Sequence, residues 1–562
     1  MRTDKHRRAI YRDLSTVLLV LCLASITYGQ QPVPSIDSIE PQKSRLAAPR
    51  IDSQTPNTFK VKHYALDLRI DPSRKSIAGQ VRMSALAIPN DLGTISLDMS
   101  DDLSVTSVKS EGHQLGFSHH NNNLNITLAH TYRVNSPFEV TIEYKGSPSG
   151  NGFVFGQHHS VPMVYSYGLP FTAQQWFPCK DAPNDKADSA DITITVPAPL
   201  VAASNGKLAK ETTNSDGTTT FYWEVRYPIY PDVISIAVTN YTAFTLQYQY
   251  SGSETMPMTF YVYPEDLEKA QKQFAVLLDM MKHHVAAFGE YPFVKEKYGV
   301  AEFAENSFRE HQTLPSFAAH LITGGHESDW ILAHELAHQW FGDSITVKSW
   351  SHVWLNEGFA TYAYALWKDS VGGKGEYTAL MRSWDKNEFV GSVFIKNNAS
   401  TNDLFTDTTF KKGAWVLHML RHVMGDEKFF TALKAYVKTY AYKSASTDDF
   451  KAVCEKHYGR SLDWFFKEWV YGINRPEYEY KWRAIQNGKR SIVKLTINQA
   501  QKNADTFEMP IDVIIKTNAG DGKFIAWQKS KSQDFAFSVQ GQPRQVELDP
   551  DDWILRKIRR LD

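Results

Sequence analysis

The chain has 562 residues, and its 61 lysines and arginines nearly balance 62 aspartates and glutamates, for a formal net charge of −1. This balance offers no electrostatic footprint for nucleic acid, so we expect no nucleic-acid partner. Single hydrophobic cores stop growing near about 250–300 residues, so the length predicts several domains.

The first 29 residues have the pattern of an export signal. Five basic residues between positions 2 and 12 precede the apolar run 17–24, and Thr27-Tyr28-Gly29 follows it. The run is shorter than the roughly 20 residues that a membrane-spanning helix needs. We expect a cleaved signal peptide over residues 1–29 and a secreted or periplasmic protein. The alternative is an uncleaved anchor, which would give the protein a membrane association.

Residues 30–58 are rich in Pro, Ser, Gln and Asp without periodicity, which predicts a flexible tether. From residue 59 to 246 the pattern is that of β-structure. Leu66, Leu68 and Ile70 alternate with polar residues, and the same alternation recurs over residues 140–144 and 192–196. Turn residues separate these runs at short intervals. The pattern predicts an N-terminal β-domain whose antiparallel sheets form a sandwich or saddle.

Helical periodicity replaces this alternation near Pro264 and defines a predicted domain over residues 247–475. Apolar residues recur with a 3.6-residue period from Leu267 to Phe288, and Gly289 is expected to end that helix. Further helices are predicted over residues 413–424, 427–440, 447–458 and 461–471. Thr447, followed by two aspartates, is the expected N-terminal cap of the 447–458 helix.

β alternation returns after Pro476, over residues 478–482, 493–497 and 511–515. It predicts a small C-terminal β-sandwich over residues 476–562. The fold class is therefore α+β multidomain, with β-domains on both sides of a mainly helical domain. Three cysteines are too few for a disulfide framework, and we expect Cys179 and Cys454 to be buried free thiols.

The helical domain contains the motif His334-Glu335-Leu-Ala-His338. Histidines four residues apart lie on one face of a helix, where both imidazoles can bind a single ion. Two imidazoles and one carboxylate would leave a fourth zinc position open for water, as in catalytic sites. Glu335, beside the first histidine, can act as general base towards that water. The pattern predicts one Zn²⁺ per chain.

The run from His334 to Asp343, together with Trp354-Leu-Asn-Glu-Gly-Phe-Ala360, resembles peptidase family M1, the gluzincin zinc aminopeptidases. Segments 176–181 and 412–417 also look like this family. The resemblance implies a thermolysin-like catalytic domain and makes Glu357, which eighteen residues separate from His338, the third metal ligand. It implies a three-domain form without the large C-terminal helical domain that many members carry. The expected substrates are peptides with a free N-terminus.

An aminopeptidase needs a carboxylate near the metal to hold the substrate's ammonium group. The family uses the glutamate of a Gly-x-Met-Glu-Asn segment, and Glu310, 24 residues before His334, is our match. Glu305, in Ala304-Glu305-Asn306, is the alternative. The same region departs from the family, because Ser307 and Arg309 replace its glycine and methionine.

Two further departures concern the reaction itself. Leu169 stands where many members have a Glu or Gln that helps to bind the amine. Phe410 replaces a tyrosine whose hydroxyl stabilises the oxyanion, and the loss of one such donor typically costs about 10²–10³ in rate. His311, His326 and His352 lie near the motif, but their spacing does not indicate ligands.

The leading hypothesis is a zinc aminopeptidase in which His334, His338 and Glu357 bind zinc, Glu335 activates water and Glu310 holds the substrate's N-terminus. Phe410 and Leu169 motivate an alternative, a catalytically weak zinc-bound protein that binds peptides. A thermolysin-type endopeptidase is the third hypothesis.

Overall fold

The computed structural model describes residues 55–168, 170–385, 389–396, 401–502 and 504–561. The predicted signal peptide and residues 30–54 of the predicted tether lie outside this part of the chain. Of the described tether residues, Thr55 is buried and donates its hydroxyl to Asp98 at 2.7 Å, whereas Pro56 and Asn57 are exposed. Across the described ranges, no helix is long and apolar enough to cross a membrane.

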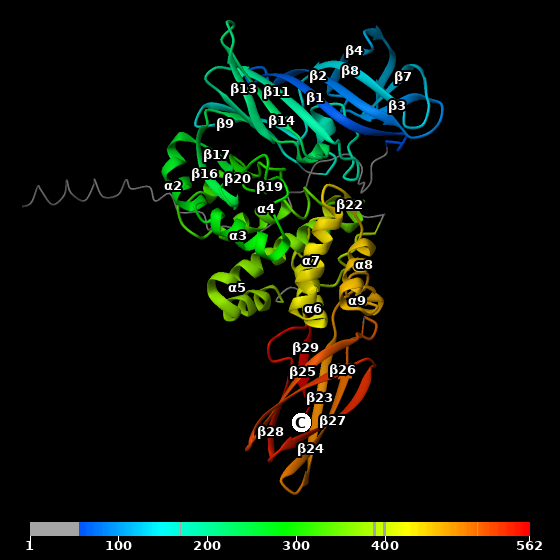
Figure 1. Ribbon diagram of the computed structural model, residues 1–562, viewed down its shortest axis with the longest axis vertical. Helices are drawn as coiled ribbons and strands as arrows, with labels where there is room; N and C mark the ends of the chain where they lie inside the picture. The colour runs from blue at the N-terminus through cyan, green and yellow to red at the C-terminus, as the bar shows by residue number, and fades with distance from the viewer. Residues whose placement is uncertain (1–54, 169, 386–388, 397–400, 503, 562) are drawn as a thin grey trace, which may run out of the picture. The chain divides into compact units, whose positions relative to one another are not determined.

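The N-terminal domain contains three sheets, drawn in blue to cyan-green in Figure 1. The largest has the order β13 (Lys207–Thr213), β14 (Thr218–Val225), β11 (Ser189–Pro197), β1 (Phe59–Asp71), β2 (Ser76–Ala87), β8 (Pro137–Gly146), β4 (Leu103–Ser110), β5 (His113–Gln114). The other two are β3 (Leu92–Asp98), β7 (Asn123–Tyr132), β6 (Gly116–His120) and β12 (Val201–Ser204), β15 (Ile236–Thr239), β10 (Val161–Ser166), β9 (Phe153–His158).

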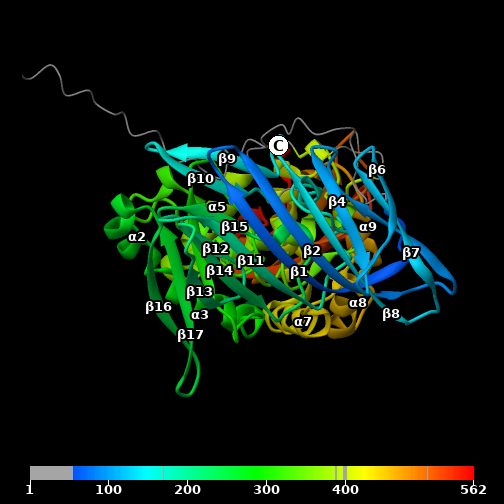
Figure 2. The ribbon, with the colours of Figure 1, turned by 90° about the horizontal axis from the view of Figure 1, so that it is seen from above.

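The predicted alternation explains how these strands pack. In β1, Leu66, Leu68 and Ile70 are at most 2% exposed, whereas Asp67 and Arg69 face solvent. The expectation of antiparallel pairing fails at one place, because β1 and β11 run parallel. Parallel neighbours need a long connection, and the intervening strands β2 to β10 provide one. Figure 2 shows β1, β2, β11 and β14 as adjacent strands.

The helical domain is built on a sheet with the order β16 (Thr242–Ser251), β17 (Glu254–Val262), β18 (Tyr298–Phe303), β20 (Ser316–Ala318), β19 (Phe308–Arg309). The predicted domain boundary at residue 246 falls inside β16, which pairs with β17 along its length. The short strand β19 lies at the edge of this sheet. A further short pair is β21 (Thr346–Val347) with β22 (Ser444–Ala445).

The described α-helices are drawn in green through yellow to orange-gold in Figure 1. They are α2 (Leu267–Phe274), α3 (Leu277–Phe288), α4 (Asp329–His338), α5 (Trp354–Trp384), α6 (Gly413–Met424), α7 (Asp426–Tyr440), α8 (Thr447–Tyr458) and α9 (Asp463–Trp469). The predicted helix 267–288 is two helices, and Gly289 follows the second with a φ of 104° that favours glycine. Gly373, with φ 73°, interrupts α5.

The N-terminal cap of α8 was wrongly predicted by one residue. Ser446, not Thr447, is the cap, and its side chain accepts a bond from the backbone of Asp449. The Asp449 carboxylate in turn accepts the Ser446 N–H at 2.7 Å. This capping box satisfies two backbone donors at once, which a threonine one position later cannot do.

The C-terminal domain, orange to red in Figure 1, has two sheets, as the predicted sandwich requires. Their orders are β27 (Ser532–Gln540), β24 (Arg490–Gln499), β23 (Glu477–Asn487), β29 (Lys557–Arg560) and β26 (Gly520–Gln528), β25 (Met509–Thr517), β28 (Pro543–Leu548). Val493, Leu495 and Ile497 are buried, as are Ile511, Val513 and Ile515. Cys179 and Cys454 are buried, as expected.

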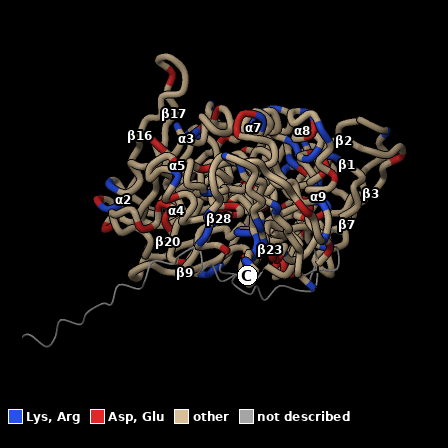
Figure 3. The backbone as a smooth tube through the Cα atoms, turned by 90° about the horizontal axis from the view of Figure 1, so that it is seen from below, with Lys and Arg blue, Asp and Glu red and all other residues tan. Residues whose placement is uncertain are grey.

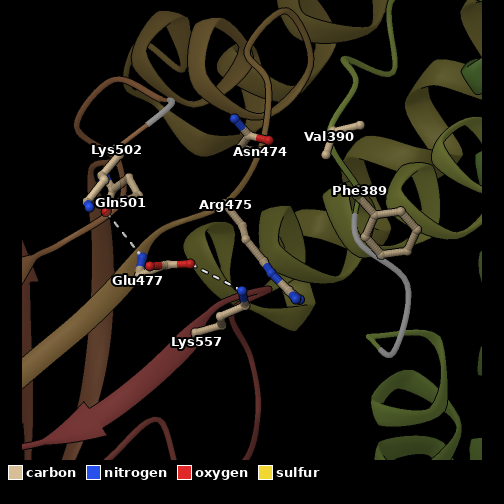
Figure 4. A pocket seen from close by; sticks show the side chains of 8 residues that line it. All are labelled: Phe389, Val390, Asn474, Arg475, Glu477, Gln501, Lys502 and Lys557. Atoms are coloured by element: carbon tan, nitrogen blue, oxygen red, sulfur yellow. Dashed lines mark hydrogen bonds and ion pairs between the residues drawn. The ribbon is translucent and has the colours of Figure 1, made fainter.

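A cavity of about 210 Å³ lies where β23 leaves the helical domain, and Figure 4 shows the side chains that line it. Lys557 forms an ion pair with Glu477 at 3.2 Å, and Gln501 accepts the Glu477 N–H. None of its lining residues belongs to the predicted site. Figure 3 shows acidic and basic segments interspersed along the described backbone.

Candidate metal centre

The helices α4 and α5 bring together the three predicted metal ligands. His334 and His338 lie on one face of α4, and Glu357 lies in the first turn of α5. All three side chains are nearly fully buried. The Nε2 atoms of the histidines are 2.9 Å apart, and Oε2 of Glu357 lies 3.4 Å from His334 and 3.5 Å from His338.

These distances fit a zinc ion. Ligand atoms about 2.0–2.1 Å from a tetrahedral zinc ion lie roughly 3.3 Å from one another. Two imidazoles and one carboxylate also form the ligand set of a catalytic zinc site with an open fourth position. The three residues therefore fit the metal by both chemistry and spacing.

The predicted substrate anchor, Glu310, lies directly behind this ligand set. Its Oε2 atom is 2.5 Å from Nδ1 of His338, the ring nitrogen that does not face the other ligands. Burial lowers the pKa of His338, but the carboxylates of Glu310 and Glu357 raise it well above its usual value. A carboxylate on the second nitrogen of a ligating histidine fixes the orientation of the ring. The carbonyl oxygen of Phe341 also lies 3.1 Å from this nitrogen, so the carboxylate and the carbonyl face it together, a contact that the sequence did not indicate.

Gly342 makes this contact possible. Its φ is 137°, and a Cβ atom placed on it would lie 2.7 Å from Oε2 of Glu310 and 3.2 Å from Nδ1 of His338. A larger residue would displace the carboxylate, so the glycine at this position is explained by close approach.

Gln339 holds the segment that carries Glu310 against α4. Its side chain accepts the Thr313 N–H at 2.8 Å and donates to the carbonyl of His311 at 3.1 Å. It also donates to Asp343 at 2.7 Å. From the N-terminal domain, Lys186 donates to the carbonyls of Asp343 and Ser344. No pattern in the sequence predicts a role for these residues, although Gln339 and Asp343 lie in the motif run that carries the resemblance.

The predicted general base, Glu335, is 3% exposed, and its Oε2 atom has no hydrogen-bond partner. Burial raises the pKa of Glu335 to about 8; His338 opposes this increase, and Glu310 and Glu357 add to it. A buried carboxylate whose oxygen is free of protein donors can accept a proton at this place.

Phe410 lies beside the metal ligands, where the resemblance places a tyrosine. Its ring stacks on that of His334, with centroids 5.9 Å apart and planes at 23°. Phe410 lies in the helical turn Thr408–Lys412, which leads directly into α6. The start of α6 packs closely on α5, since a Cβ on Gly358 would lie 2.9 Å from the backbone of Gly413. Leu169, the other departure near the amine site, lies outside the described residues.

The remaining candidates are separate from the ligand set. The carboxylate of Glu305 accepts a short hydrogen bond from Tyr165 and forms no ion pair with the described ligands. His311 faces Ser316, His326 pairs with Asp329 and His352 bonds Thr447. Tyr230 also lies near the site, although the sequence did not predict it there. Burial and the charges of Glu310 and Asp343 raise its pKa well above the usual value. No motif marks it among 27 tyrosines.

A second group of residues whose donor atoms lie close together is His158, His159 and Glu265. His159 and Glu265 are exposed, and the Glu265 carboxylate already pairs with His158 at 2.6 Å. The buried group at His334 is the better metal site, because its three donors converge from two helices and are shielded from water.

Comparison with known proteins gives two family matches. The Peptidase M1 N-terminal domain matches residues 60–230, and the Peptidase family M1 domain matches residues 308–469. Aminopeptidase M1-B of Oryza sativa subsp. japonica is 31% identical over an alignment of 406 residues that covers 67% of this chain and 43% of that protein. Aminopeptidase M1 of Arabidopsis thaliana is 29% identical over 59% of this chain and 39% of its own length. The chain thus matches less than half of the length of these curated relatives.

Solved structures show the same architecture. The M1 zinc metallopeptidase from Deinococcus radiodurans superposes with a TM-score of 0.63 at 25% identity, covering 75% of this chain and 94% of that one. Legionella pneumophila aminopeptidase A has a TM-score of 0.79 at 19% identity over 91% of this chain and 61% of its own, a likeness of fold alone. The two domain matches, the relatives and the converging ligand set agree, and the chain belongs to peptidase family M1.

Proposed function

We propose that this protein is a zinc-dependent aminopeptidase that removes N-terminal residues from peptides. The observation that carries the proposal is the buried convergence of His334, His338 and Glu357, with the carboxylates of Glu335 and Glu310 beside them. The relatives from rice and Arabidopsis are named as aminopeptidases, and a Deinococcus structure holds a Tyr-Ser-Ala substrate. These names support a peptidase and give no support to a protein that only binds peptides.

Each residue of the site has its own role in the proposed reaction. Zinc held by the three ligands would polarise the scissile carbonyl and activate a water molecule. Glu335 accepts the proton of that water and returns it to the leaving amine. Glu310 keeps His338 in place with Oε2, while its other oxygen accepts a hydrogen bond from the ammonium group of the substrate. The same carboxylate thus serves the metal and selects a free N-terminus.

The experiment that tests the proposal compares a tripeptide with its N-acetylated form, using zinc-loaded protein. The acetyl group removes the positive charge that Glu310 binds, so we expect cleavage of the free peptide and none of the blocked one. Equal rates of internal cleavage in both would favour a thermolysin-type endopeptidase instead.

We also propose that the protein is exported with cleavage after residue 29. The basic segment and short apolar run of the first 29 residues support this. N-terminal sequencing of protein made in a secreting host should begin at Gln30. An intact N-terminus in the membrane fraction would favour the anchor.

A further inference from the structure

Arg309 is the residue directly before Glu310, and the proposed reaction does not use its side chain. Arg309 ends the edge strand β19. Phe308 and Glu310 contact α4, since the Phe308 ring lies 6.2 Å from that of His334 and Glu310 faces His338. Arg309 stacks on Tyr167, with its guanidinium carbon 3.7 Å from the ring centre, and it lies near enough to Glu335 on α4 for the two charges to interact.

The guanidinium is only partly satisfied by the protein. Nη1 donates to two neutral acceptors, Ser307 Oγ at 2.8 Å and the carbonyl oxygen of Phe308 at 2.6 Å. Nε is buried without a partner, and no described residue accepts a bond from Nη2. A buried donor without an acceptor is costly. The unmet hydrogen-bonding capacity indicates a missing acceptor.

The missing acceptor should be an anion. No carboxylate of a described residue forms an ion pair with Arg309, although Glu335, Glu357 and Glu310 lie near enough to act on its charge. Burial lowers the pKa of Arg309 to about 10, so the group stays charged at neutral pH. A guanidinium binds a carboxylate through two parallel hydrogen bonds, which fits the free Nε and Nη2 donors.

We infer that Arg309 binds a carboxylate in the side chain of the substrate's N-terminal residue, so that the protein prefers peptides that begin with aspartate or glutamate. This deepens the proposed function and rests on it. A residue whose ammonium group lies at Glu310 can extend its side chain over the neighbouring position, where Arg309 stacks on Tyr167.

The test compares glutamate with glutamine, because the two side chains have nearly the same shape and differ in charge. First, zinc-loaded protein is titrated with free L-glutamate and L-glutamine in a calorimeter. Second, kcat/KM is measured for the glutamyl and glutaminyl arylamides. Both measurements are repeated on Arg309→Met and Arg309→Lys. The first measurement does not depend on turnover.

We expect glutamate to be favoured about tenfold or more in both measurements, the factor expected of one charge-assisted pair. Arg309→Met should bring the ratio close to one, and Arg309→Lys should keep part of it, because lysine retains the charge without the planar fork. Because each ratio is taken on a single protein, a partial loss of stability in a variant cancels.

Equal affinity for glutamate and glutamine, or a preference that survives in Arg309→Met, would overturn the inference. Hydrolysis of neutral arylamides with no preference for glutamate would overturn it while leaving the aminopeptidase proposal intact. Absence of all hydrolysis would contradict the aminopeptidase proposal, and the calorimetric ratio would still decide whether Arg309 recognises a carboxylate.

Discussion

Oε2 of Glu310 lies 2.5 Å from Nδ1 of His338, so the predicted substrate anchor also contacts a metal ligand. In the proposed function, a single carboxylate therefore couples two steps, the binding of the metal and the recognition of the substrate's N-terminus. A purely structural carboxylate would affect the first step only, and a purely substrate-binding one the second only.

Replacing Glu310 with Gln should weaken both steps. Loss of a carboxylate behind a ligating histidine typically lowers metal affinity about 10–100-fold, and loss of its charge should raise KM for peptides with a free N-terminus. Zinc affinity is measured by competition with a chelator, and KM on aminoacyl-arylamides. Glu305→Gln is the matched control, because Glu305 bonds Tyr165 and should leave zinc affinity unchanged. If Glu305→Gln impaired KM and Glu310→Gln did not, the assignment of the anchor would be wrong.

Replacing Phe410 with Tyr should increase turnover. The ring already stacks on His334, so the new hydroxyl would enter the site beside the metal ligands. An added oxyanion donor contributes up to about 10²–10³ in kcat, with little effect on KM. Single-turnover kinetics on an arylamide would measure the change. An unaltered kcat would mean that another donor already stabilises the oxyanion.

Local patterns predicted the local parts of the fold and site. The i, i+4 spacing placed His334 and His338 correctly, and strand alternation identified the buried faces of β1, β8 and β11. Side-chain contacts between segments far apart in the sequence could not be predicted from these local patterns. The contacts of Glu310 with His338 and of Arg309 with Tyr167 depend on how β19 lies between α4 and the N-terminal domain. The parallel pairing of β1 with β11 has the same origin, since periodicity shows which face is buried and not which strand is adjacent.

Gly358→Ala should destabilise the protein and reduce its activity. A Cβ there would lie 2.9 Å from the backbone of Gly413, forcing α5 and α6 apart next to the ligand Glu357. Overpacking of this kind costs about 1–3 kcal/mol. Gly375→Ala is the control: nothing lies within 4 Å of its Cβ, and the change should be neutral or stabilising by up to about 1 kcal/mol. Thermal unfolding of the zinc-loaded proteins measures both. A Gly358→Ala protein as stable as the wild type would show that the helices can separate freely.

Glu302 should make stability depend on pH. Burial raises its pKa to about 9, although the Tyr263 N–H opposes this increase, and nearby Asp266 adds to it. Because the folded pKa lies above the unfolded value, folding favours the protonated form. The stabilisation is complete below about pH 4.5 and is lost as the pH rises towards 9, by up to about 1.4 kcal/mol per pH unit.

Glu302→Gln keeps an acceptor for Tyr263 and removes the titration. Relative to this variant, the wild type should lose stability steadily between pH 5 and 9 in thermal unfolding. Parallel curves for the two proteins would show that Glu302 titrates normally in the folded state.

The most direct test of the central claim pairs zinc content with turnover in wild type and Glu335→Gln. Glu335 contributes no ligand atom to the predicted metal group, so the variant should keep one equivalent of zinc. Loss of the general base should lower the hydrolysis of aminoacyl-arylamides by about 10²–10⁴. The account predicts a zinc-loaded wild type that cleaves these substrates and a zinc-loaded variant that does not. A variant as active as the wild type, with its full zinc content, would contradict it.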